Sequence, residues 1–166
     1  MSESNAKRPG WILPVATVIF LVASDQVSKW VVEATFPLGS SSIVIPGFFN
    51  LVHIQNKGAA FGFLSGIDSA WINRGFTATA TLALFVIVFL YRSLGPNEKV
   101  AKVAMVLIGA GALGNLIDRI RLGSVTDFLL FYVGEYSWPA FNVADSCVTV
   151  GVTLLAYSII FHHPKA

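Results

Sequence analysis

The chain has 166 residues, of which 55% are hydrophobic and only 12% are charged, and its formal net charge is +2. Because soluble globular domains carry about 25% charged residues, this composition excludes an ordinary water-soluble domain. The slight net charge and the lack of a basic cluster also exclude a nucleic-acid-binding surface.

A transmembrane helix needs about 20 mostly apolar residues, and the sequence holds four such segments. They predict an all-α membrane protein with one polytopic domain over residues 1–166. The predicted spans are about 11–32, 70–91, 100–118 and 142–161. The first span is too long for a cleaved signal peptide and carries two charged residues, so we expect it to remain as a transmembrane helix.

Lysine and arginine residues near the span ends indicate orientation, because cytoplasmic loops carry an excess of them. The residues that count here are Lys7, Arg8, Arg92, Lys99, Lys102 and Lys165. They place both termini and the turn at 92–99 in the cytoplasm. The long connections 33–69 and 119–141 are then extracytoplasmic.

Each extracytoplasmic connection has its own pattern. In the first, the runs Ile43–Ile45 and Asn50–Ile54 are interrupted by Pro46-Gly47, a pattern typical of short strands. In the second, aromatic and aliphatic residues within 128–138 suit the lipid headgroup zone. The sequence therefore predicts a small extracytoplasmic β-sheet and a short extracytoplasmic amphipathic element.

The polar residues of the spans collect near the outer side of the membrane. They are Asp25 and Lys29 in the first span, Asn115, Asp118 and Arg119 at the end of the third, and Asn142 and Asp145 at the start of the fourth. Ionisable residues inside a membrane are costly and are functional candidates by default. Asp25 and Lys29, at positions i and i+4, equally suit a structural ion pair.

The motif Asn-x-x-Asp occurs twice, at Asn115–Asp118 and at Asn142–Asp145. Residues three apart share one face of a helix, and Gly111 and Gly114 allow a neighbouring helix to approach closely. Two carboxylates in a partly desolvated site cannot both ionise easily, so one keeps its proton. Such a pair supplies an acid and a base for amide hydrolysis without a metal or other cofactor, as in aspartic proteases.

Other functions stay open on these residues alone. A carboxylate near the interface can simply be solvated. A proton-coupled small membrane transporter uses aspartates in its spans, although no inner-leaflet polar counterpart completes a pathway here. A magnesium-dependent lipid phosphotransferase can also work with two carboxylates, although only Arg119 and Arg121 are at hand to hold a phosphate.

Four sequence blocks resemble, in this order, the bacterial lipoprotein signal peptidases, also called signal peptidase II. They are NKGAAFG (Asn56–Gly62), GNLIDR (Gly114–Arg119), GSVTDF (Gly123–Phe128) and WPAFNVADS (Trp138–Ser146). The resemblance implies an aspartic endopeptidase that removes signal peptides from prolipoproteins before a diacylglyceryl-modified cysteine. It also implies a multi-pass protein of the bacterial inner membrane with its site near the outer face.

The resemblance further implies roles for individual residues. The family's catalytic aspartates carry over to Asp118 and Asp145, and its substrate-binding residues to Asn56, Asn115, Arg119 and Asn142, while Asp25 and Lys29 match a supporting D-x-x-[TS]-K block. No metal or cofactor is implied. The implied partners are prolipoproteins, membrane lipid and globomycin-type peptide inhibitors.

Overall fold

The computed structural model describes residues 10–58 and 69–161. Its helices are α1 (Ile12–Thr35), α2 (Ser69–Ser93), α3 (Lys99–Leu122) and α4 (Val143–Phe161). All four are long and apolar enough to cross a membrane, which confirms the multi-pass architecture. Lys7, Arg8 and Lys165, which contribute to the expected orientation, lie outside the described residues, as does the part of the first sequence block after Gly58.

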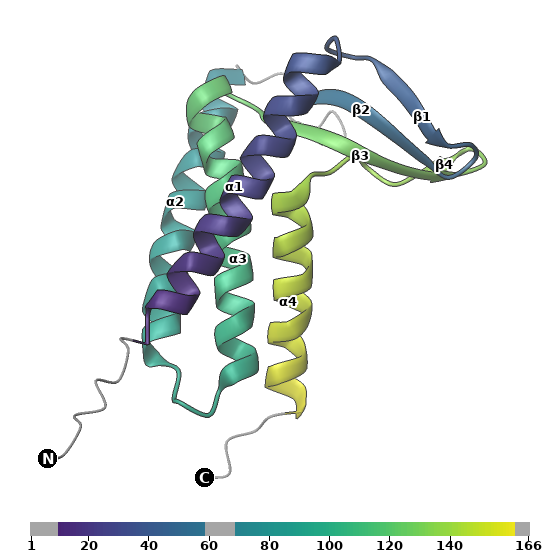
Figure 1. The fold of residues 1–166 in the computed structure, drawn as a ribbon. Coiled ribbons are helices and arrows are strands. Elements are labelled where there is room, and N and C mark those ends of the chain that lie inside the picture. The colour runs from purple at the N-terminus through teal and green to yellow at the C-terminus, as the bar shows by residue number, and fades with distance from the viewer. Residues whose placement is uncertain (1–9, 59–68, 162–166) are drawn as a thin grey trace, which may run out of the picture.

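Helix α3 lies at the centre of the bundle and contacts each of the other three helices. Figure 1 shows that α1 begins and α4 ends at the same end of the bundle, away from the sheet. A Cβ atom at Gly114 would lie only 2.7 Å from Asp25 Oδ2, and one at Gly111 would meet the backbone of Ala144. These two glycines therefore let α1 and α4 approach α3 as closely as the sequence predicts.

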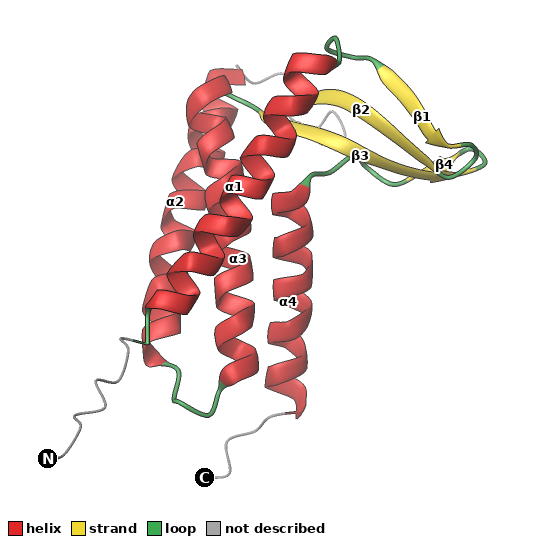
Figure 2. Ribbon diagram, viewed as in Figure 1, coloured by secondary structure: helices red, strands yellow, loops and turns green. Residues whose placement is uncertain are grey.

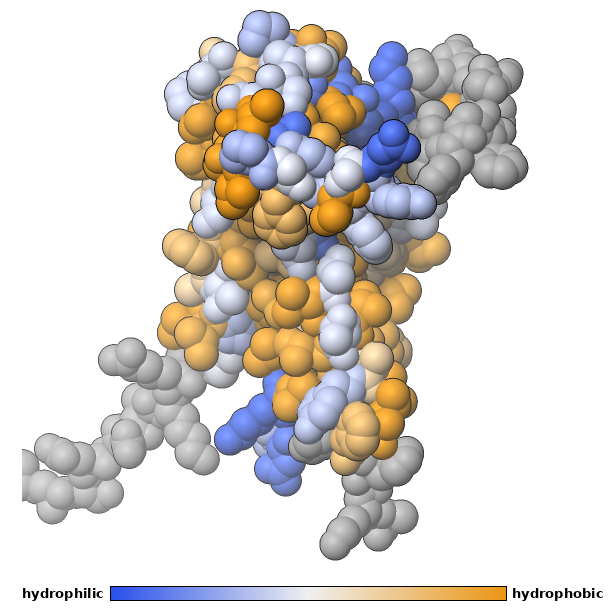
Figure 3. Space-filling model, turned by 90° about the vertical axis from the view of Figure 1, so that its right-hand side faces the viewer, coloured by the Kyte–Doolittle hydropathy of each residue, from blue (hydrophilic) through white to orange (hydrophobic). Residues whose placement is uncertain are grey.

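The surface of the bundle is apolar, whereas charged groups lie inside it. Phe20, Phe85 and Phe89 are 69%, 71% and 72% exposed, but Asp25 and Lys29 are 1% and 0% exposed. Figure 3 shows a hydrophobic middle zone on one face, with hydrophilic residues above and below it. This distribution is the one expected of helices that face lipid and satisfy their polar groups internally.

The sheet has four antiparallel strands in the order β1-β2-β3-β4. Strands β1 (Ser41–Ile45) and β2 (Phe49–Asn56) come from the first long connection, and β3 (Val125–Val133) and β4 (Tyr136–Ser137) from the second. Figure 2 shows the sheet projecting sideways from one end of the bundle. The predicted small sheet is confirmed, and the amphipathic element expected in the second connection is strand β3, which pairs with β2.

Helix α3 runs one turn past its predicted end at Asp118. It ends at Leu122, and Gly123 follows in a left-handed conformation (φ 74°) with its N–H bonded to the Arg119 carbonyl. Such a glycine terminates a helix and redirects the chain. Strand β3 begins two residues later, so this turn carries the chain directly from α3 into the sheet.

Candidate active site

Lys29 of α1 lies at the centre of a buried cluster of charges. Its Nζ is 2.8 Å from Asp25 Oδ2 and 2.9 Å from Asp118 Oδ2, and it donates to Asn115 Oδ1 at 3.0 Å. The side chains of Lys29 and Asp118 are fully buried. The ion pair predicted between Asp25 and Lys29 is confirmed, and Asp118 is the second acid of the same cluster.

Both carboxylate oxygens of Asp118 have further donors. Gln26 Nε2 donates to Oδ1 at 2.9 Å, and the Thr126 backbone N–H donates to Oδ2 at 3.1 Å. Gln26 also donates to Asp25 Oδ2 at 3.1 Å and so joins the two acids. Asp118 is thus tied to α1 and to the start of β3.

Asp25 connects this cluster to the start of α4. Its Oδ1 accepts a hydrogen bond from the Ala144 backbone N–H at 2.9 Å. The first N–H groups of a helix lack partners within the helix, and a carboxylate there also interacts favourably with the helix dipole. We name Asp25, Gln26, Lys29 and Asp118 the lysine cluster, and its contacts hold α1, α3 and α4 together.

Asn142 immediately precedes α4 and caps it. Its Oδ1 accepts from the Asp145 backbone N–H at 2.9 Å, and Asp145 Oδ2 accepts from the Asn142 backbone N–H at 3.3 Å. This reciprocal pair is the capping-box arrangement, with Asp in the place usually taken by Glu or Gln. The second Asn-x-x-Asp motif therefore both starts the helix and orients the Asp145 carboxylate.

The side chain of Asn142 also reaches Asp127, a buried residue of β3. Asn142 Nδ2 donates to Asp127 Oδ1 at 2.8 Å, and Asn56 Nδ2 donates to Asp127 Oδ2 at 3.0 Å. A backbone bridge between Leu129 and Phe141 brings the start of α4 to this part of β3. One asparagine therefore holds both Asp127 and Asp145, which we name the aspartate pair.

The pKa of the Asp127 carboxyl is raised from 3.8 to about 6, chiefly because burial disfavours its charged form. The negative charge of Asp145 raises the pKa as well, whereas the hydrogen bonds from Asn56 and Asn142 and the charge of Lys29 lower it. In residues 10–58 and 69–161, no lysine or arginine lies within ion-pair distance of either member of the pair. Asp127 can therefore carry a proton close to neutral pH.

Asn115 joins the lysine cluster to the aspartate pair. Its Oδ1 accepts from Lys29, and its Nδ2 donates to Asp145 Oδ1 at 2.7 Å. Its oxygen also accepts from Asn142 Nδ2 at 3.3 Å. Lys29 thus orients the Asn115 amide, and that amide in turn positions Asp145, which is partly exposed.

Asn56 and Arg119 lie at the edge of this network. Asn56 is exposed at the end of β2, and its Oδ1 accepts from the Gly58 N–H at 2.8 Å, which turns its Nδ2 toward Asp127. The Arg119 guanidinium lies 5.3 Å from the Phe76 ring centroid and interacts electrostatically with both members of the aspartate pair. The structure thus gathers every candidate site residue at one end of the bundle.

The structure also places the aspartates in two environments that the sequence alone does not separate. Asp118 lies beside Lys29. Asp127 is instead bonded to the Asn142 side chain, which also accepts from the Asp145 backbone N–H. The signal for Asp127 in the sequence is a single charge in the run VTDFLLF (Val125–Phe131), inside the GSVTDF block. Among the described residues, no group of three or more His, Cys, Asp or Glu side chains is arranged to hold a metal ion.

Comparisons with known proteins identify the family. The family model described as Signal peptidase (SPase) II matches residues 17–161. The chain is 47% identical over 154 residues to a lipoprotein signal peptidase of Nitratidesulfovibrio vulgaris, covering 93% of this chain and 91% of the relative. It is 45% identical over 149 residues to that of Geobacter metallireducens, covering 90% of each.

A solved structure has the same architecture. It is described as a bacterial membrane enzyme determined by the in meso method at 1.9 Å resolution, and it superimposes with a TM-score of 0.80. The two sequences are 34% identical, and the match covers 91% of this chain and 94% of the other. The chain belongs to the signal peptidase II family of aspartic peptidases.

Proposed function

We propose that Asp127 and Asp145 are the catalytic pair with which this chain cleaves the signal peptides of prolipoproteins. The assignment rests on the Asn142 side chain. Its Nδ2 donates to the Asp127 carboxylate, and its Oδ1 accepts from the backbone N–H of Asp145. Asp118, which the sequence resemblance assigns to catalysis, instead supports the site, since it is fully buried and forms an ion pair with Lys29, which also pairs with Asp25.

The chemistry follows from the different surroundings of the two acids. Asp127 is buried and has a pKa of about 6, so it supplies the proton that polarises the scissile carbonyl. Asp145 is partly exposed and is held by the Asn115 amide and a backbone N–H. It takes a proton from the attacking water. The two carboxyls titrate as one system, so one proton shared by the pair gives the active form.

Asn56 and Arg119 are suited to hold the substrate. Asn56 is exposed beside Asp127, and Arg119 is a half-buried donor near Asp145. Both can donate hydrogen bonds to peptide carbonyls next to the scissile bond. Removing either is expected to weaken substrate binding and to misplace the bond relative to the pair, where an error of about 1 Å can cost a hundredfold in rate.

The substrate is expected to be anchored by its lipid. In the proposed orientation both termini and the 92–99 turn are cytoplasmic, and the aspartate pair lies near the outer face of the bacterial inner membrane. A diacylglyceryl group held in the outer leaflet would fix the depth of the modified cysteine relative to the pair. Globomycin-type peptides are expected to occupy the same site.

The decisive experiment is incubation of detergent-purified protein with a diacylglyceryl-modified prolipoprotein, followed by mass analysis. Cleavage immediately before the modified cysteine is expected, and EDTA should not reduce it. An intact substrate together with proton-linked solute uptake into vesicles would favour the transporter. Activity lost in EDTA and restored by magnesium would favour metal-dependent chemistry.

A matched substrate with an unmodified cysteine tests the anchoring. It should be cleaved more slowly, with a lower turnover as well as a weaker apparent affinity. Equal rates would show that the signal helix alone sets the depth. Reporter fusions after residue 166 and within 92–99 should report a cytoplasmic location, and an external C-terminus would contradict the orientation.

A further inference from the structure

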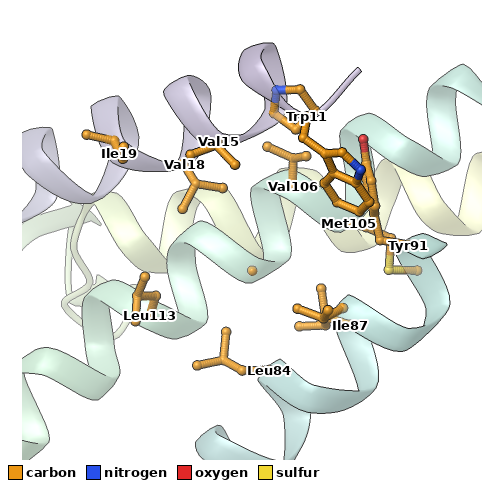
Figure 4. Close-up of a pocket in the computed structure, with 13 residues that line it drawn as sticks. Trp11, Val15, Val18, Ile19, Leu84, Ile87, Tyr91, Met105, Val106 and Leu113 are labelled. Atoms are coloured by element: carbon orange, nitrogen blue, oxygen red, sulfur yellow. The ribbon is translucent and has the colours of Figure 1, made fainter. Parts of the chain in front are cut away.

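A groove lies at the end of the bundle opposite the aspartate pair, between α1, α2 and α3. Its volume is about 270 Å³. Figure 4 shows Val15 and Val18 of α1, Leu84 and Ile87 of α2, and Leu113 of α3 around a common space. None of the described residues that line it carries a charge.

A glycine leaves room in the wall of the groove. Gly109 of α3 lines it, and a Cβ atom there would meet only Ile87 Cγ2, at 3.5 Å. That distance is an ordinary van der Waals contact, so a side chain could be accommodated. The glycine therefore widens the groove locally, and a larger residue at this position would fill part of it.

One end of the groove is at the level expected for a membrane–water interface. Trp11 and Tyr91 line this end with their rings 5.0 Å apart, just before α1 begins and just before α2 ends. Tryptophan and tyrosine are enriched at that level. From there the lining continues from Trp11 to Ile19 on α1, which at 1.5 Å per residue is about 12 Å toward the bilayer centre.

Two cations lie close in sequence to lining residues at this end of the groove. The Arg92 guanidinium lies 5.8 Å from the Trp11 ring centroid. Lys102 precedes Met105 and Val106 of the lining by three and four residues, so it shares their face of α3. Across the described ranges of the chain, neither cation has a carboxylate within ion-pair distance, and the nearby Glu98 carboxylate accepts from the Gly95 N–H.

We propose that this groove binds one acyl chain of an anionic phospholipid whose phosphate pairs with Arg92 and Lys102. An apolar slot with cations at its interfacial end complements a hydrocarbon chain that ends in a negative headgroup. Its volume lies below the roughly 300–1,000 Å³ of sites that enclose drug-sized ligands, which suits a slender chain. The bound lipid fills the gap between the three helices at the end remote from catalysis.

Two other occupants fit less well. A substrate signal helix is about 10 Å wide, too wide for this slot, and the basic n-region of a signal peptide would meet Arg92 and Lys102. A second copy of the chain is disfavoured because helices associate in lipid through small or polar residues, and Gly109 is the one glycine among the lining residues.

Quenching of Trp11 fluorescence by brominated phospholipids tests the proposal directly. The protein carries Trp30→Phe, Trp71→Phe and Trp138→Phe, and is placed in phosphatidylcholine vesicles containing a small fraction of brominated phosphatidylglycerol or brominated phosphatidylcholine. We expect phosphatidylglycerol to quench Trp11 more strongly at equal mole fraction. A single juxtamembrane cation changes the affinity for anionic lipid by about fivefold, so Arg92→Gln should reduce the preference by that order.

Variants at Gly109 separate binding in the groove from general contact with lipid. Gly109→Leu should lower the quenching of Trp11 by phosphatidylglycerol, and the milder Gly109→Ala should lower it partly with little change in packing. The matched control retains Trp30 as the sole tryptophan, which is 62% exposed on α1 but outside the groove. Trp30 should show no preference between the two lipids.

Three results would overturn the proposal. Equal quenching of Trp11 by both lipids would show that the site does not select an anionic headgroup. A preference at Trp30 equal to that at Trp11 would show that the preference does not arise in the groove. Quenching that Gly109→Leu leaves unchanged, together with cross-linking between two copies through residues of the groove, would assign the surface to self-association. The readout is lipid binding, so it stands whether or not the catalytic assignment holds.

Discussion

The lysine cluster and the aspartate pair each contain two buried or half-buried aspartates at the same end of the bundle, but their partners differ. In the lysine cluster, Asp25 and Asp118 flank one ammonium at 2.8 and 2.9 Å. In the aspartate pair, asparagine amides and a backbone N–H are the hydrogen-bond donors to the carboxylates. Asn115 contacts both groups.

In the proposed mechanism this difference in partners accounts for the different roles of the aspartates. A buried carboxylate beside a lysine is neutralised by an opposite charge, and breaking such a pair exposes the protein to a large desolvation cost. A buried carboxylate held by neutral amides lacks that compensation, so burial favours its protonated form. The same residue type therefore joins helices in the lysine cluster, whereas in the aspartate pair we propose that it transfers protons.

The largest expected effect is on turnover in the aspartate pair. Asp127→Asn and Asp145→Asn each remove an acid–base group while keeping its shape, so the cleavage rate should fall by about 10²–10⁴-fold. Single-turnover cleavage of a modified prolipoprotein measures this loss. Asp118→Asn is the matched control and should retain activity per folded molecule. Full activity of Asp127→Asn, with none in a folded Asp118→Asn, would return the catalytic role to Asp118.

Lys29→Met should produce the largest loss of stability. It leaves Asp25 and Asp118 buried without their cation, and breaking a buried pair in this way costs about 3–5 kcal/mol in the free energy of unfolding. Denaturant unfolding in detergent measures the change. Lys57→Met, at an exposed lysine, is the control and should stay within about 0.5 kcal/mol of the wild type. A wild-type stability for Lys29→Met would show that the lysine cluster does not hold the helices together.

Asp118→Asn should be less destabilising, because Lys29 keeps Asp25 as its partner. In either orientation, however, the NH₂ group of the new amide faces a donor in a fully buried position. It faces Gln26 if it replaces Oδ1, and it faces Lys29 and the Thr126 N–H if it replaces Oδ2. An unsatisfied buried donor costs about 1–3 kcal/mol. The same unfolding measurement applies, with Asp127→Asn as the comparison. Greater stability loss in Asp127→Asn than in Asp118→Asn would reverse the distinction drawn between the two clusters.

The smallest effect concerns the pH dependence. If the active form shares one proton, kcat/KM falls as the pH rises through the Asp127 pKa of about 6. The hydrogen bond from Asn56 stabilises the ionised carboxylate and lowers this pKa. Asn56→Ala should therefore move the basic limb of the pH profile, where kcat/KM falls, to higher pH. Asn50→Ala, further along the same strand, should leave it in place. A limb that stays fixed or moves down in Asn56→Ala would contradict the role given to Asp127.

Much of the architecture follows from local patterns. Four apolar segments of sufficient length predict the four helices, and β-branched runs broken by Pro46-Gly47 predict β1 and β2. The i,i+4 spacing of Asp25 and Lys29 predicts their ion pair, which forms at 2.8 Å. These features depend on residues close together in the chain, so periodicity and spacing are enough to recognise them.

Other features depend on contacts between distant segments. The pairing of β3 with β2, which opposes Asp127 to Ile54, joins a strand that follows α1 to one that follows α3, and these two helices are in contact. The sequence predicts an amphipathic element within 128–138, because the hydrophobicity of this segment suits either a headgroup-facing segment or a half-buried strand. Its place in the sheet is decided by the free edge of β2 beside it.

Apolar length and residue type are local properties, so the amino-acid sequence already indicates that this chain crosses a membrane several times and which polar residues are candidates for a site. Which aspartates lie beside a lysine and which do not follows from the folding of distant segments onto one another. Lys29 reaches Asp118 from another helix, and Asn142 reaches Asp127 from the start of α4. The environment of a carboxylate is set by groups within about 3 Å of it, and helix packing brings those groups from distant parts of the chain.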